Sequence, residues 1–216
     1  MALSKIDTPA LVADAVDNTI LDVADDFAFT GTVTGAGGTP GLVHLSTQTL
    51  ASDASEVAFN SLIDTSANTN YKIYAQGLND TDGAVLRAVF RDSSDTDITG
   101  TNYYRGRDLI GSAAGNDPFM HFTPAIGANG TTNVEIGFAL EINLSLINQA
   151  ANNSIMPHMY GNCTYVATNG DPSHGSFGWI MRPDIVTTDV AGIRFYPSSG
   201  NFKAGSKFVL YGLAES

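Results

Sequence analysis

The C-terminal segment constrains the fold of this chain more than any other, because it contains two short apolar runs separated by turn residues. Residues 192–213 read GIRFYPSSGNFKAGSKFVLYGL. Ile193 and Phe195 in the first run, and Phe208 and Leu210 in the second, alternate with polar or small residues. A period of two is typical of strands that bury one face, and Ser-Ser-Gly-Asn favours a turn. We expect the two runs to form a hairpin that closes a β-built domain.

The rest of the chain repeats this pattern of strand and turn. The chain has 216 residues, with 22 glycines, 10 Lys and Arg together, and 43% apolar residues, which suits strands joined by turns better than long helices. We predict an all-β fold, an antiparallel β-sandwich of the jelly-roll kind. The predicted strands are 57–63, 71–78, 85–91, 133–146, 156–167, 177–181, 192–196 and 207–213.

Four side chains in the predicted strands have an expected structural role. The run 133–146 alternates for longest, so we place it centrally in a sheet, with Glu135 and Glu141 facing outward. Cys163, the one cysteine, lies in an apolar run and is expected to be a buried thiol without a disulfide. Trp179 is expected to pack between the sheets.

The first 38 residues differ in composition from the remainder. They contain six aspartates and one lysine, and their apolar residues come in pairs at a spacing that does not favour a helix. We predict an extended N-terminal anchoring arm with a Gly-rich linker over residues 1–38, and a β-sandwich domain over 39–216. An arm this short cannot bury its own apolar residues, so we expect it to dock by strand addition. The predicted interface residues of the arm are Leu11, Val12, Val16, Ile20, Leu21, Val23, Phe27 and Phe29.

The charge of the chain argues against two classes of partner. The formal net charge is −12, and the few basic residues are dispersed along the sequence. Binding to nucleic acid or to an anionic membrane depends largely on clustered Lys and Arg, so we expect neither partner. The N-terminus has aspartates where a signal peptide needs an apolar core, and we expect no secretion signal.

Two segments resemble parts of bacteriophage proteins. Residues 25–35, DDFAFTGTVTG, are similar to a stretch near the start of phage tail-fibre and head-fibre proteins. Residues 195–212, FYPSSGNFKAGSKFVLYG, resemble the closing segment of many phage virion proteins. The two segments together contain 29 residues and lie toward the two ends of the sequence. It implies a structural virion protein made in the host cytoplasm, of the capsid decoration (cement) or head-fibre type. It also implies a homotrimer that docks on the major capsid protein or another virion protein.

The segment 92–124 is the least regular part of the predicted domain. It contains Tyr103, Tyr104, Arg105 and Arg107, and Tyr and Arg are enriched at the centres of interfaces. One reading is an exposed recognition or inter-subunit loop, and the other is an ordinary edge strand followed by a loop.

Catalytic and metal-binding motifs are weak in this sequence. The run 200–207 has Ser before Lys, so it lacks the order of a phosphate-binding loop, and no Gly-x-Ser-x-Gly elbow is present. The four histidines lack zinc-ligand spacing. Asp92, Asp95 and Asp97 faintly resemble a calcium loop without its closing glutamate, and we expect a turn there. We expect no enzyme activity and no cofactor.

A second function stays open beside the structural one. The chain has features of a short tail fibre or a carbohydrate-binding module that recognises a host glycan. Sugar sites on β-sandwiches use exposed aromatic residues beside Asp and Asn. The candidates from the sequence are Tyr103, Tyr104, Tyr160 and Trp179.

Overall fold

The computed structural model describes residues 41–64, 70–99, 103–106, 113–123, 137–146, 157–181 and 190–213. The chain divides into two units, residues 1–38 and 39–216, and every described residue belongs to the second. The predicted interface residues of the arm therefore lie outside the described residues. None of the described segments forms a helix long and apolar enough to cross a membrane.

The described residues are all-β, as predicted. They form twelve strands: β1 (Leu42–Thr49), β2 (Val57–Phe59), β3 (Asn70–Leu78), β4 (Leu86–Arg91), β5 (Tyr103–Gly106), β6 (Ala113–Asp117), β7 (Met120–His121), β8 (Gly137–Ser145), β9 (His158–Val166), β10 (Pro172–Met181), β11 (Gly192–Pro197) and β12 (Lys207–Leu213).

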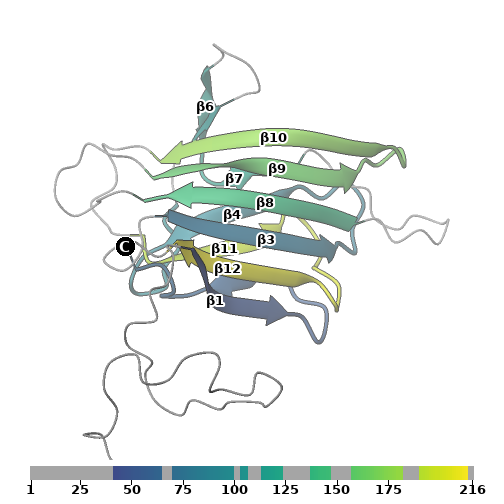
Figure 1. Ribbon diagram of the computed structural model, residues 1–216. Coiled ribbons are helices and arrows are strands. Elements are labelled where there is room, and N and C mark those ends of the chain that lie inside the picture. The colour runs from purple at the N-terminus through teal and green to yellow at the C-terminus, as the bar shows by residue number, and fades with distance from the viewer. Residues whose placement is uncertain are drawn as a thin grey trace, which may run out of the picture. The chain divides into compact units, whose positions relative to one another are not determined.

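These strands make two antiparallel sheets that form a β-sandwich. The large sheet has the order β1-β12-β3-β8-β9-β10-β5-β6, and the small sheet has the order β2-β11-β4-β7. Figure 1 shows the large sheet in front, with β4, β7 and β11 of the small sheet behind it. The inward side chains of both sheets share one core, which explains why apolar residues alternate along most of the strands.

The strand order is compatible with the predicted jelly roll. Strands β1, β12, β3 and β8 lie side by side in this order in the large sheet, and β2, β11, β4 and β7 lie side by side in the small sheet. Several strands that follow one another in the chain, such as β1 and β2, β3 and β4, or β11 and β12, therefore lie in opposite sheets. Strands β9, β10, β5 and β6 extend the large sheet beyond β8. Several connections run through residues outside the described ranges, so the jelly roll itself stays a prediction.

The C-terminal runs do not form the expected hairpin. β11 pairs with β2 and β4 in the small sheet, whereas β12 pairs with β1 and β3 in the large sheet. Residues 198–206 therefore cross from one sheet to the other. The alternation in each run reflects a core that both sheets share: Phe195 and Phe208 meet across it with ring centroids 5.5 Å apart.

Other expectations for single elements are met in part. β8 lies between β3 and β9 in the interior of the large sheet, so the central placement of this strand is confirmed within 137–145. Cys163 and Trp179 are buried, also as predicted. β1 was not predicted, because it is an edge strand whose Leu42 and Val43 are exposed and show no alternation toward the core.

Candidate functional site

The most distinctive surface in the described structure is the outer face of the large sheet. Along β3, Tyr71, Ile73 and Ala75 are buried, and the residues between them point away from the core. β8, β9 and β12 have the same alternation, because successive side chains of a strand point to opposite faces. We call the following outward side chains of these four strands the tyrosine face: Lys72, Tyr74, Gln76, Ala139, Glu141, Asn143, Tyr160, Asn162, Thr164, Lys207, Val209 and Tyr211.

The strand register places these side chains in rows across the sheet. The first row runs Lys207, Gln76, Ala139, Thr164; the second runs Val209, Tyr74, Glu141, Asn162; the third runs Tyr211, Lys72, Asn143, Tyr160. Strands lie about 4.8 Å apart and alternate residues along a strand about 6.7 Å apart, so the backbone positions of Tyr74 and Tyr160 are roughly 12 Å apart. The rows therefore make one continuous surface that carries tyrosines at separate points.

Aromatic rings stand out from this surface. Tyr160 is 59% exposed and Tyr74 is 38% exposed, and with Leu42, Val43 and Leu213 they are the exposed large hydrophobic residues among those described. The ring of Tyr211 lies edge-on to Tyr74, with centroids 6.0 Å apart, and His44 of β1 packs on the other side of Tyr211 at 5.7 Å. These contacts support the ring of Tyr74 from one side.

The tyrosine face is nearly free of carboxylates. The chain has 22 Asp and Glu residues, but the six strands β1, β12, β3, β8, β9 and β10 contain Glu141 alone. The same strands contain Lys72, Lys207 and three histidines. The local charge of this surface thus opposes the net charge of −12 of the whole chain.

The one carboxylate of the face has a fixed partner. Lys72 Nζ lies 2.5 Å from Glu141 Oε1, and it also lies 5.2 Å from the centre of the Tyr74 ring. Hydrogen bonds to Glu141 and Tyr74 raise the pKa of Lys72 above its ordinary value. The pair favours the charged form of Lys72 and places its ammonium group beside Tyr74. The outward orientation predicted for Glu141 is confirmed.

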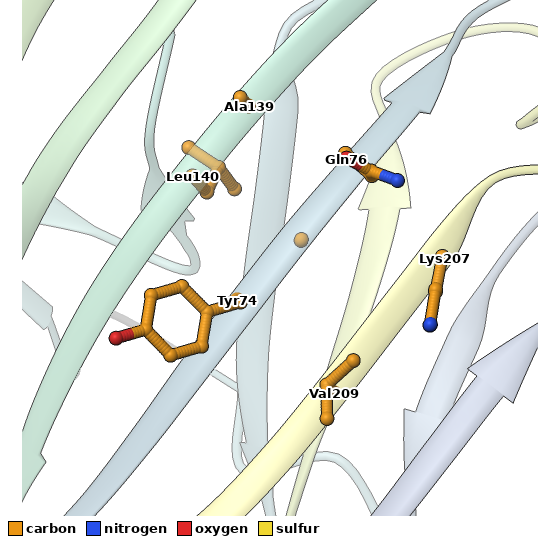
Figure 2. A pocket seen from close by; sticks show the side chains of 7 residues that line it. Tyr74, Gln76, Ala139, Leu140, Lys207 and Val209 are labelled. Carbon is orange, nitrogen blue, oxygen red and sulfur yellow. The ribbon is translucent and has the colours of Figure 1, made fainter.

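Two shallow hollows open along this surface. The first, of about 280 Å³, is lined by Tyr74, Gln76, Lys207, Val209, Ala139, Ala75 and Leu140. Figure 2 shows these side chains on three adjacent strands around it. The second hollow, of about 360 Å³, is lined by Leu42, Asn70, Tyr71, Lys72, Asn143, Leu144, Ser145, Tyr160 and Leu213. Each hollow thus combines an exposed tyrosine with amide and ammonium groups.

The aromatic residues predicted from the sequence as recognition candidates differ in their exposure to solvent. Tyr103 is fully buried: its hydroxyl accepts from Phe90 N–H at 2.9 Å and donates to the Ile98 carbonyl at 2.8 Å. Trp179 is 1% exposed, and its Nε1–H donates to the His121 carbonyl at 2.9 Å. Both are core residues, so Trp179 packs in the core as predicted, and the reading of Tyr103 as an exposed recognition residue is wrong. Tyr160 is exposed, and its role in recognition stays a prediction.

The other members of the predicted recognition loop are partly outside the described structure. Tyr104 and Arg105 lie in β5, which pairs with β10 and β6 near one edge of the large sheet. This segment is a strand of the sheet, in line with the alternative reading, and its first residue, Tyr103, packs in the core. Arg107 lies outside the described residues. An interface role for Tyr104, Arg105 and Arg107 stays a prediction.

The aspartates of the possible calcium loop have protein partners. Asp92 Oδ1 accepts the backbone N–H groups of Ser94 at 2.8 Å and Thr96 at 2.9 Å, as in a tight turn. Asp97 instead pairs with Arg194 on β11 and with Arg91 on β4. Within the described ranges, no three His, Cys, Asp or Glu side chains are grouped as a metal site would need.

A group of arginines on the outer side of the small sheet was not predicted from the sequence. Arg194 bonds to Asp97 and, at 2.8 Å, to Glu56, and the Arg87 guanidinium lies 4.0 Å from the centre of the Phe119 ring. Partial burial by itself lowers the pKa of Arg194, but the hydrogen bonds that Arg194 donates to Asp97 and Glu56 outweigh it and raise that pKa. These contacts join distant segments, so we assign this cluster a structural role.

The tyrosine face was also missed from the sequence. Its signal is the period-two spacing of Lys72, Tyr74 and Gln76 in the run 70–76, but the run alone does not show which strands lie beside it. Comparison of the chain with protein-family models, with curated proteins and with solved structures finds no match.

Proposed function

We propose that the chain is a non-catalytic structural component of a tailed-phage virion, of the capsid decoration or head-fibre type. The observation that carries the proposal is the occurrence in one chain of DDFAFTGTVTG and FYPSSGNFKAGSKFVLYG, on either side of a β-rich middle. The antiparallel β-sandwich is compatible with this role, since virion proteins commonly use two-sheet β folds.

In this proposal the two parts of the chain have different tasks. The arm, residues 1–38, docks on the major capsid protein or another virion protein through apolar residues such as Leu11, Val16 and Phe27. The sandwich points outward, and three copies associate as a homotrimer. A net charge of −12 keeps such a displayed domain soluble at the high local concentration of a particle surface.

Deletion of residues 2–30 tests the docking role of the arm. We expect the truncated protein to fold, because the shared core of the described sandwich is built from residues 57–210, but to be lost from purified particles. Circular dichroism and thermal melting check the fold, and quantitative mass spectrometry of particles measures incorporation. A folded, truncated protein that is incorporated at the wild-type level contradicts the proposal.

A second candidate function is recognition of a host glycan, in a short tail fibre or as a carbohydrate-binding module. The observation that favours it is the tyrosine face, where Tyr74 and Tyr160 stand beside amide side chains over two hollows. Jelly-roll lectins combine a β-sandwich with sugar binding, so the fold is compatible with this role too. Glycan binding that is lost with Tyr160→Ala, at unchanged thermal stability, is the expected result. Binding that is unaffected by this change contradicts the role of this surface.

A further inference from the structure

The first hollow on the tyrosine face has the chemistry of a binding subsite. Tyr74 forms one wall, and Gln76 and Lys207, which are directly paired across β3 and β12, form another. Lys72 sits by the Tyr74 ring but does not line this hollow, so the hollow opens on another part of the ring. Figure 2 shows Tyr74, Gln76 and Lys207 around the same space. A flat apolar ring beside hydrogen-bonding groups suits one face of a sugar ring.

The cation in this hollow has no carboxylate partner. Lys72 is paired with Glu141, and Lys203, on the loop 198–206, is 3.2 Å from Asp53. Among the described residues, Lys207 has neither an ion pair nor a hydrogen bond to its ammonium group, and it is exposed. Its charge is therefore available to an acidic group on a ligand, at a place where the surrounding strands contribute Glu141 as their one carboxylate.

The rest of the face continues the site toward β9. The second hollow adds Asn143, Lys72 and the exposed ring of Tyr160, and the neighbouring positions on β8 and β9 in the second row are Glu141 and Asn162. Val209 and Ala139 are the aliphatic side chains within the tyrosine face, and the exposed Leu42 and Leu213 line the second hollow at the β1 edge. A polar, extended ligand that runs from the first hollow to Tyr160 meets stacking and hydrogen-bonding groups along its length.

We propose that the tyrosine face binds an acidic polysaccharide, with an acidic sugar unit in the first hollow against Tyr74 and Lys207 and further units extending to Tyr160. This inference rests on the second candidate function above and names its site and ligand class. The net charge of −12 means that the chain as a whole repels acidic polymers, so binding of such a polymer identifies a local site rather than general electrostatic attraction.

The test uses the full chain on a microbial glycan array that carries acidic and neutral bacterial O-antigen and capsular polysaccharides. We expect the bound glycans to be acidic. The affinity for the best of them is then measured by calorimetry. We expect Tyr74→Ala to weaken binding about tenfold or more, and Lys207→Gln to weaken it about fivefold and to reduce its dependence on salt.

Two matched variants serve as controls. Tyr196→Ala removes a half-buried tyrosine on the small sheet, and Lys203→Gln removes a half-buried lysine outside the tyrosine face. Both are expected to bind like the wild type. Thermal melting of every variant distinguishes a loss of binding from a loss of folding. Tyr74→Phe keeps the aromatic ring and is expected to retain most of the wild-type affinity.

Three results overturn the proposal. These are a wild-type protein that binds no glycan on the array, bound glycans that are all neutral, and binding to acidic glycans that survives both Tyr74→Ala and Lys207→Gln. None of them bears on whether the protein is part of a virion, because that is measured separately by its incorporation into particles.

Discussion

At the scale of single residues, the direction in which a tyrosine points decides its role. Tyr103 and Tyr160 both lie in strands of the large sheet, but Tyr103 is buried with two backbone hydrogen bonds and Tyr160 is 59% exposed. The sequence does not distinguish them, because a strand shifted by one residue exchanges its two faces. The residues around Tyr103, YYRG, show no alternation that would fix its orientation.

Tyr103→Phe is predicted to destabilise the domain without affecting any binding. The change leaves the Phe90 N–H and the Ile98 carbonyl without their hydroxyl partner in the core, which costs about 1–3 kcal/mol. Urea denaturation measures the free energy of unfolding, with Tyr160→Phe as an exposed control that is expected to show no change. Equal stability of the two variants would show that Tyr103 is not the core residue described here.

At the scale of elements, two features hold the sandwich together that no single run of sequence reveals. One is the close approach of β8 and β9, where Gly161 faces the core between Ile142 and Phe177. A methyl group at Gly161 would overlap the Glu141 carbonyl oxygen in the backbone of the neighbouring strand. The other is the crossing segment 198–206, which side chains from distant loops hold in place.

Gly161→Ala is therefore predicted to be strongly destabilising, by about 3 kcal/mol or more, because the backbone of β8 must move. Gly178→Ala is the matched control: it lies opposite residue 160 on the adjacent strand β10, and its added methyl would meet Met159 O at an ordinary distance of 4.0 Å. Thermal and urea denaturation compare the two. A Gly161→Ala protein as stable as Gly178→Ala would contradict the described packing of β8 on β9.

The contacts of the crossing segment predict how the stability of the fold depends on pH. Asp80 accepts the Asn201 N–H at 2.8 Å, and Asp53 accepts the Ala204 N–H at 2.8 Å. These backbone hydrogen bonds lower the pKa of both carboxyls from the ordinary value of 3.8. A carboxyl with a lowered pKa in the folded state stabilises the fold above its unfolded pKa, and this contribution is lost as the pH falls through the folded value.

Asp80→Ala is thus expected to lower the melting temperature at pH 7, and the difference from the wild type is expected to shrink as the pH falls below about 3.8. The control is Asp171→Ala, whose carboxylate accepts from Asn169 at 2.7 Å within its own turn and does not reach the crossing segment. Melting curves between pH 2 and pH 7 check the prediction, because this range extends below the ordinary carboxyl pKa of 3.8. A difference that grows as the pH falls would contradict it.

At the scale of the whole molecule, the sequence was sufficient for the fold class and insufficient for the site. The alternation in runs such as 137–145 and 207–213 reports local burial, which is why the all-β sandwich and most of its central strands were predictable. The partners of each strand depend on contacts far apart in the chain, so the predicted C-terminal hairpin was wrong. The tyrosine face needs the register of four strands from residue 72 to residue 211, and no local pattern contains it.

The distribution of charge over the whole molecule links the two proposed functions. The carboxylates lie mainly outside the six strands of the tyrosine face and its neighbours, and residues 1–38 carry six aspartates. An acidic chain with one carboxylate-poor face is suited to display that face outward while the arm makes protein contacts. Display of such a face on a particle is compatible with both the decoration and the tail-fibre proposals.

Cryo-EM localisation of the protein on intact phage particles tests the proposed virion role. We expect density for a two-sheet domain repeated over the capsid, at threefold or quasi-threefold positions, with an extended segment reaching the shell. Density confined to the tail would replace the decoration role with the receptor-binding alternative. Absence of the protein from purified particles would contradict the virion function altogether.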